Sequence, residues 1–198
     1  MKLWVLSSLA TLTAVSVALA HTGSQHPGGF GYGFGHPLGG LDHLLAMLAV
    51  GLWAAQVGGR ATWAVPLCFV TLMAVGGGLG MAGATIPMVE AGILASVLVL
   101  GLLIAFSAKL PLWFSTVLVG VFAVFHGLAH GAEMPVSVSG LEYALGFILA
   151  TALLHLAGIV MAWGGAQVAR LPTLNKFQLW RLVGGAIFFG GAYLGLVG

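Results

Sequence analysis

Charged side chains are scarce in this sequence: Asp, Glu, Lys and Arg make up 5% of its 198 residues. A net charge of +2 carried by so few residues cannot form the dense basic patch that nucleic-acid binding requires, so we exclude that class of function. Cysteine is nearly absent too. Cys68 is the single thiol and lies in a hydrophobic stretch, which excludes a disulfide framework or a thiolate cluster and predicts a small core side chain.

Apolar residues are correspondingly abundant, at 60% of the chain, and the mean hydropathy is +1.12. Soluble proteins average about 45–50% apolar and 25% charged residues. Stretches of about 20 apolar residues, separated by Gly, Pro and charge, therefore predict an all-α, polytopic membrane helix bundle. Its six transmembrane helices are expected near Leu41–Gly58, Ala61–Met81, Pro87–Ser107, Pro111–Gly131, Leu141–Trp163 and Arg181–Val197.

The first twenty residues are typical of a cleavable secretory signal. Lys2 supplies the positive start, an apolar run follows, and Ala18-Leu19-Ala20 is a small-residue cleavage site. An uncleaved first transmembrane helix is the alternative, although the run is shorter than the ~20 residues that a span needs. The predicted organisation is a signal peptide (1–20), a Gly/His-rich periplasmic segment (21–40) and a six-helix transmembrane domain (41–198).

The distribution of charge predicts the orientation of the chain. If the processed terminus lies outside, the loops with Arg60, Lys109 and Arg170–Lys176–Arg181 all face the cytoplasm, as the positive-inside rule requires. We therefore expect a multi-pass protein of the bacterial inner membrane with a periplasmic amino terminus. All four carboxylates, which are Asp42, Glu90, Glu133 and Glu142, then lie in the periplasmic half.

The segment between the signal and the first span is rich in glycine and histidine, and we expect it to be too glycine-rich to hold a packed structure alone. After cleavage, His21 would present both an amine and an imidazole, and His26 follows nearby. Capture of a metal ion by this tail and a role as a plain linker are both open.

Ionisable side chains in or beside lipid are expensive and mark a functional site by default. His126, His130 and Glu133 have i, i+4, i+7 spacing, which puts them on one face of a helix. Two imidazoles one turn apart can bind a single ion, with a carboxylate on the next turn. The alternative is a polar stripe that hydrogen-bonds a neighbouring helix.

A second cluster stands at the start of the first predicted span. Asp42 and His43 diverge by about 100° on a helix, so one of them is expected to point into the bundle and the other to orient it or reach a neighbouring helix. His36 precedes Pro37 and a Gly-Gly pair, and either folds back over the same point or is an ordinary loop residue.

Two further ionisable residues have weaker contexts. Glu90 begins an otherwise apolar helix, so it either needs a partner across the bundle or favours the positive helix N-terminus, an effect of about 0.3–1 kcal/mol. His155 lies deeper and is either a relay for an ion or a histidine bonded between helices. The candidate metal ligands are His36, Asp42, His43, Glu90, His126, His130 and Glu133. These nitrogen and oxygen donors suit a borderline divalent cation.

At these residues the chain resembles the HupE/UreJ family, membrane proteins associated with nickel supply to hydrogenase and urease. The matching patterns are His36-x5-Asp42-His43 and Phe125-His126-Gly-x-Ala-His130-Gly-x-Glu133. The resemblance implies a nickel, or cobalt, permease in which His36, Asp42, His43, His130 and Glu133 handle the metal. The identity of the ion comes from this resemblance and not from the donor chemistry.

The leading hypothesis is therefore a secondary transporter, not an enzyme, whose partners are a divalent metal substrate and the lipid bilayer, with no resident cofactor. The sequence has no G-x-x-x-x-G-K-[ST] motif for a nucleotide. One alternative is a zinc-dependent intramembrane hydrolase with Glu133 or Asp42 as the base, although no G-x-S-x-G signature is present. Another is a metal sensor or chaperone that binds without transporting.

Overall fold

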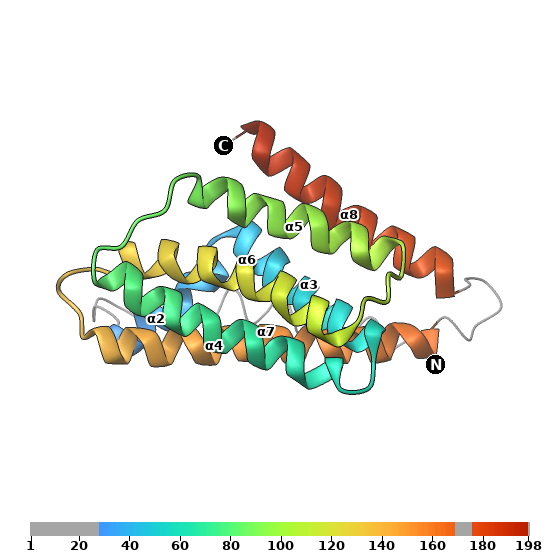
Figure 1. Cartoon of the computed structure of the whole chain (residues 1–198), viewed down its shortest axis with the longest axis horizontal. Coiled ribbons are helices and arrows are strands. Elements are labelled where there is room, and N and C mark those ends of the chain that lie inside the picture. Colours follow the sequence, from blue (N-terminus) through green and yellow to red (C-terminus); the bar gives the residue numbers. More distant parts are fainter. Residues whose placement is uncertain (1–27, 169–175, 198) are drawn as a thin grey trace, which may run out of the picture.

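The computed structural model describes residues 28–168 and 176–197, and this part of the chain is helical without any strand. Its helices are α2 (Gly29–Gly39), α3 (Leu41–Val57), α4 (Ala61–Met81), α5 (Val89–Ala105), α6 (Leu112–Ala132), α7 (Gly140–Val168) and α8 (Lys176–Val197) (Figure 1). The predicted signal peptide, His21, His26 and Arg170 lie outside the described residues.

Each of the six apolar stretches predicted to be a span is a helix, with bounds close to the expected ones. The prediction of six full spans is confirmed only in part. Four helices, α4, α6, α7 and α8, are long and apolar enough to cross a membrane. The pair α2 and α3 meets at an angle of 84° and makes a fifth candidate as one broken span, whereas α5 has 17 residues and is shorter than the ~20 that a span needs.

Helix α2 forms from part of the glycine-rich segment, which was expected to be too glycine-rich to hold a packed structure alone. Residues Gly29–Gly39 form a helix that lies along α7. The glycines are the cause, because Gly33 lies against the Tyr143 backbone and Gly146 against the Phe30 backbone, so closely that an added methyl group would overlap main-chain atoms. A helix that would be unstable alone is thus stabilised by close packing on a neighbour.

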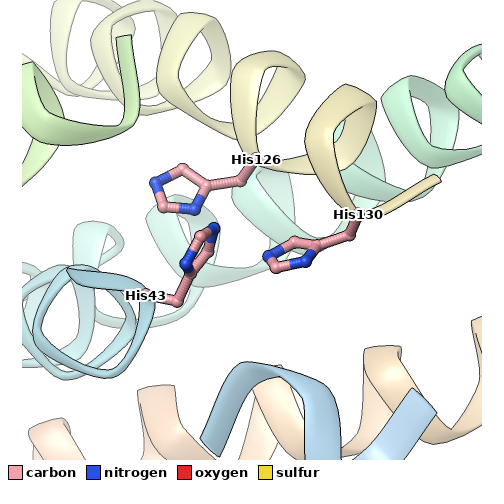
Figure 2. Close-up of side chains that lie close together, drawn as sticks. All are labelled: His43, His126 and His130. Atoms are coloured by element: carbon pink, nitrogen blue, oxygen red, sulfur yellow. The ribbon is translucent and has the colours of Figure 1, made fainter. Parts of the chain in front are cut away.

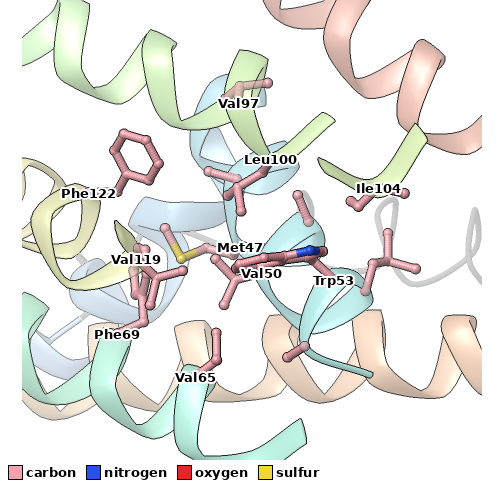
Figure 3. Packing of buried hydrophobic residues seen from close by; sticks show 14 of the residues in the cluster. Met47, Val50, Trp53, Val65, Phe69, Val97, Leu100, Ile104, Val119 and Phe122 are labelled. Atoms are coloured by element: carbon pink, nitrogen blue, oxygen red, sulfur yellow. The ribbon is translucent and has the colours of Figure 1, made fainter. Parts of the chain in front are cut away.

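The bundle is assembled from pairs of helices: α4 lies on α6, α5 on α8, and α3 on α7. Gly76, Gly77 and Gly80 of α4 meet Gly127 and Gly131 of α6, and their missing side chains let the two backbones approach. Large apolar side chains fill the space around α3 (Figure 3), among them Met47, Val50, Trp53, Phe69 and Leu100.

Charge is separated along the bundle. The starts of α3, α5 and α7 and the ends of α4 and α6 lie at one end, whereas the α3–α4 and α5–α6 connections and the start of α8 lie at the other (Figure 1). All four carboxylates are therefore at the first end, and Arg60, Lys109 and Arg181 are at the second. This is the arrangement expected from the loop charges.

Candidate metal site

Ionisable residues from four helices line one cavity at the carboxylate end of the bundle. The cavity has a volume of about 390 Å³ and its lining includes His36 of α2, Asp42 and His43 of α3, Glu90 of α5, and His130 and Glu133 at the end of α6. Since one water occupies about 30 Å³ of liquid volume, the cavity has room for a dication together with its inner shell of waters. Of the seven predicted ligands, six line this cavity.

The seventh predicted ligand, His126, is fully buried and is not part of the cavity lining, and it completes a cluster of three imidazoles with His43 and His130 (Figure 2). One ring nitrogen from each residue lies within 4.8 Å of the other two, and the centroid of the His43 ring lies 4.8 Å from that of His126 and 4.1 Å from that of His130. His126 and His130 are buried, and His43 is 9% exposed. We call these three residues the histidine cluster.

The alternation of histidine and glycine on α6 explains how this cluster forms. His126 and His130 are one turn apart and face His43 of α3. Each is followed by a glycine, Gly127 or Gly131, which lies about 100° further round the helix. That second face packs on the α4 backbone. The motif therefore holds two imidazoles inward because the glycines beside them lock α6 against α4.

Asp42 turns to its own neighbour rather than across the bundle. Its Oδ1 accepts a hydrogen bond from Nδ1 of His43 at 2.9 Å and from the His43 backbone N–H at 2.8 Å. Because Nδ1 then carries the proton, Nε2 of His43 has a free lone pair, and this buried atom has no hydrogen-bond partner among the described residues. A carboxylate that orients an imidazole in this way also raises its basicity as a ligand.

Ser96 of α5 does the same for His126. Its hydroxyl donates to the carbonyl of Ile93 at 2.6 Å, so the contact at 3.0 Å between Ser96 Oγ and His126 Nε2 requires Nε2–H to donate to the serine oxygen. The Nδ1 atom of His126 is left as a buried acceptor without a partner in the described chain. Sequence reasoning missed Ser96, and its signal was weak: it is a single hydroxyl within the apolar run of α5.

A second, more exposed group of donors adjoins the histidine cluster. His36, His130 and Glu133 also have ligand atoms within 4.8 Å of one another, so His130 belongs to both groups. Nε2 of His36 donates to Oε2 of Glu133 at 3.0 Å, and Nδ1 of His130 lies 3.7 Å from the same oxygen. His36 therefore folds back over the site, as one of its two predicted roles required.

Glu133 follows the last turn of α6 and is about half exposed, with 54% of its side chain accessible. The His130 imidazole, and then that of His36, lower the pKa of Glu133 to about 2 and outweigh its partial burial, which acts in the opposite direction. The carboxylate is consequently ionised at any physiological pH.

Glu90 has no hydrogen bond or ion pair with the described residues, so the expected partner across the bundle is not found. Instead, Glu90 is exposed where three cavities meet. It lines the site cavity, a second cavity of about 480 Å³ together with Asp42, and a third of about 210 Å³ together with Glu133. Its position places a negative charge at the mouth of the site.

A sequence model of the family described as HupE / UreJ protein matches residues 9–194 of the chain. The chain belongs to the HupE/UreJ family. Among its relatives is Protein HupE of Rhizobium leguminosarum bv. viciae, which is 44% identical over 194 residues, covering 98% of this chain and 97% of the relative. No solved structure matches.

Membership of the HupE/UreJ family and the apolar helices together make this a multi-pass membrane protein. The residues that the family resemblance singled out, His36, Asp42, His43, His130 and Glu133, come from both motifs and all line the single cavity described above. His126 and Ser96 extend that set inward, into the protein interior.

Proposed function

We propose that this HupE/UreJ protein is a secondary transporter that takes up Ni²⁺, or Co²⁺, from the periplasm across the bacterial inner membrane and supplies a metalloenzyme such as hydrogenase or urease. The observation that carries the proposal is the histidine cluster. Its three imidazoles converge, and two of them line a cavity that carboxylates also line. The choice of nickel or cobalt rests on the family resemblance, because the same donors also suit zinc.

The first step of the proposed mechanism is capture at the mouth of the cavity. Glu90 and Glu133 attract a hydrated dication, and the ionised Glu133 holds His36 over the site. Removing water from a divalent ion is costly, and the oxygen and nitrogen donors of the cavity replace part of that shell while the remaining waters still have room.

The second step is transfer to the histidine cluster. Nε2 of His43 and Nδ1 of His126 have free lone pairs because Asp42 and Ser96 hold the other nitrogen of each ring. His130 belongs to both groups of donors and so can pass the ion from one to the other. Three imidazoles leave other coordination positions of the ion open to water or to the next donor, which suits a site that the ion must leave again.

Inward movement needs no nucleotide. The positive-inside rule puts Arg60, Lys109 and Arg181 in the cytoplasm, so the cavity opens to the periplasm. A dication that moves to a negative interior gains about 4.6 kcal/mol per 100 mV, twice the value for one charge.

The decisive test is flux of radiolabelled nickel at nanomolar concentration into proteoliposomes with an inside-negative potential, with cobalt, zinc and manganese as competitors. We expect His43→Ala and His130→Ala to lower the initial rate about tenfold or more, a loss at least as large as that for groups that merely orient a ligand. Cys68→Ser is the control, because Cys68 does not line the site cavity and, among the described residues, its thiol donates to the Thr116 carbonyl, ten residues before His126. Metal binding without flux would favour a sensor or chaperone, and turnover of a lipid or peptide without flux would favour a hydrolase.

A further inference from the structure

A fourth buried imidazole lies beyond the histidine cluster. His155 of α7 is 1% exposed, and neither of its ring nitrogens has a hydrogen-bond partner among the described residues. The alternative of a histidine bonded between helices therefore finds no support in this part of the chain. A buried polar group without a partner is unfavourable, and in membrane proteins such groups mark pathways for ions.

One aromatic ring connects His155 with the histidine cluster. Phe69 of α4 contacts both, since its centroid lies 5.6 Å from that of His126 and 5.2 Å from that of His155. The His155 ring meets Phe69 edge to face, at 90°. His155 is thus the next nitrogen donor inward from His126.

Two further donors stand one turn from this contact, on the same faces of the two helices. Met73 follows Phe69 on α4, and Thr151 precedes His155 on α7, each by four residues. The Thr151 hydroxyl donates to the Met73 sulfur at 3.7 Å, and both side chains are buried. Met73 also lines a cavity of about 30 Å³ with His130. A thioether and an imidazole are both ligands for borderline and softer cations.

His155 also borders a groove between α4 and α7 that extends towards the basic end of the bundle. This groove has a volume of about 390 Å³ and reaches Thr62 on α4 and Trp163 on α7. Exposed apolar side chains such as Trp63 and Leu67 show that it opens on the outer surface of the bundle. The residues at its far end are close in sequence to Arg60 and to the end of α7. The imidazole is therefore placed between the histidine cluster and the end that carries the positive charges.

We propose that His155 is a second, transient binding point for the divalent cation, inward from the histidine cluster, with the Met73 thioether and the Thr151 hydroxyl one turn nearer to that cluster. This inference rests on the proposed function. Close packing fixes the height of the ring in the bundle, because Gly51 of α3 lies against the His155 carbonyl and Gly158 against the Leu48 carbonyl, with no room for a side chain at either position.

The test compares binding with flux in the full-length protein. We expect His155→Leu to bind nickel in detergent with an affinity within threefold of the unchanged protein, because the histidine cluster is intact, and to lose at least tenfold in the initial rate of nickel flux into proteoliposomes. His155→Cys keeps a metal donor at this position and should recover a substantial part of the flux. His155→Gln keeps the polarity and roughly the size of the side chain, and its nickel flux should be as slow as that of His155→Leu. It replaces the leucine variant in the test if that variant does not insert into the membrane.

Each outcome decides the inference. Flux by His155→Leu or His155→Gln within twofold of the unchanged protein overturns it. A folded variant that loses nickel binding together with flux also overturns it, since His155 would then be needed by the histidine cluster and would not be a separate binding point. Absence of any metal flux in the unchanged protein removes the proposed function, and the inference with it, whereas full flux in the His155 variants removes the inference alone.

Discussion

Ser96 contributes a single hydroxyl to the site, yet it determines which nitrogen of His126 is available to a metal ion. Its hydroxyl donates to the Ile93 carbonyl, so its oxygen accepts a hydrogen bond from Nε2–H of His126 and leaves Nδ1 without a proton. Asp42 has the corresponding role for His43. Asp42 and Ser96 thus determine which ring nitrogen of His43 and His126 carries the proton, although neither residue belongs to the histidine cluster.

We expect Ser96→Ala to weaken nickel binding by about 10-fold to 100-fold, the usual effect of removing a group that orients a metal ligand. Ser96→Thr keeps the hydroxyl and should restore most of the affinity. Titration of the purified protein with nickel measures both effects. Ser115→Ala is the matched control, because Ser115 is an equally buried serine of α6 that bonds only to the Leu110 and Pro111 carbonyls. Equal affinities for Ser96→Ala and Ser115→Ala would contradict the orienting role.

Glu133 provides a prediction about pH. Its neighbours His130 and His36 lower its pKa to about 2, so the side chain loses its charge only when the pH falls towards 2 and stays ionised between pH 5 and pH 8. The factor by which Glu133→Gln weakens nickel binding should therefore be constant over that range. Binding by the unchanged protein should nevertheless fall on acidification, since imidazole ligands must be neutral.

Affinities measured at several pH values for Glu133→Gln and for the unchanged protein check this expectation. Glu142→Gln removes a carboxylate at the same end of the bundle that does not line the site cavity, so it should leave the affinity unchanged. A Glu133→Gln effect that disappears as the pH falls from 8 to 5 would mean that the carboxylate titrates in this range, contrary to its contacts with two imidazoles.

At the scale of the helix, α2 links a packing contact to the site. Gly33 lies against the Tyr143 backbone of α7, and three residues later His36 reaches Glu133. Gly33→Ala would introduce a methyl group where main-chain atoms of α7 lie, so we expect α2 to move away and take His36 from the cavity. The predicted result is weaker nickel binding, about tenfold, as for the loss of any group that supports a metal ligand.

Gly35→Ala is the matched control for this experiment. Gly35 lines the site cavity, but a side chain there meets no atom within 4 Å and one methyl group is small against a volume of about 390 Å³. Alanine favours a helix over glycine by up to about 1 kcal/mol, so nickel affinity and thermal stability should be retained or slightly improved. If Gly33→Ala binds nickel as well as Gly35→Ala does, the docking of α2 on α7 is not needed for the site.

The helices differ in how far the sequence could predict them. Apolar runs bounded by Gly58, Pro111 and the loop charges predicted α3, α4 and α6 almost to the residue, because hydropathy and breakers act locally. Helix α2 was not predicted, since its stability comes from glycine contacts with α7, a helix more than 100 residues away. Similarly, the His126-x3-His130 spacing predicted two inward imidazoles, but the contact with Ser96, 30 residues earlier, depends on which helices are neighbours.

At the scale of the whole molecule, the two ends of the bundle differ in charge and in chemistry. The cavity with its carboxylates and histidines lies at one end, and Arg60, Lys109 and Arg181 lie at the other. A voltage that is negative at the basic end therefore drives a cation in the direction from the cavity to His155. Positive charges at the basic end do not attract a cation. They therefore suit an end at which the ion leaves the protein and is not captured.

This asymmetry leads to a quantitative expectation for transport. One elementary charge gains about 2.3 kcal/mol per 100 mV, so a dication moving alone should accumulate about tenfold for every 30 mV of inside-negative potential. Accumulated nickel in proteoliposomes, measured at several potentials set by potassium and valinomycin without a pH gradient, gives this slope. Exchange of one proton for each nickel ion would carry one net charge and require about 60 mV for the same factor. Exchange of two protons would make accumulation independent of voltage and sensitive to a pH gradient, so a flat response would contradict purely voltage-driven uptake while leaving the site intact.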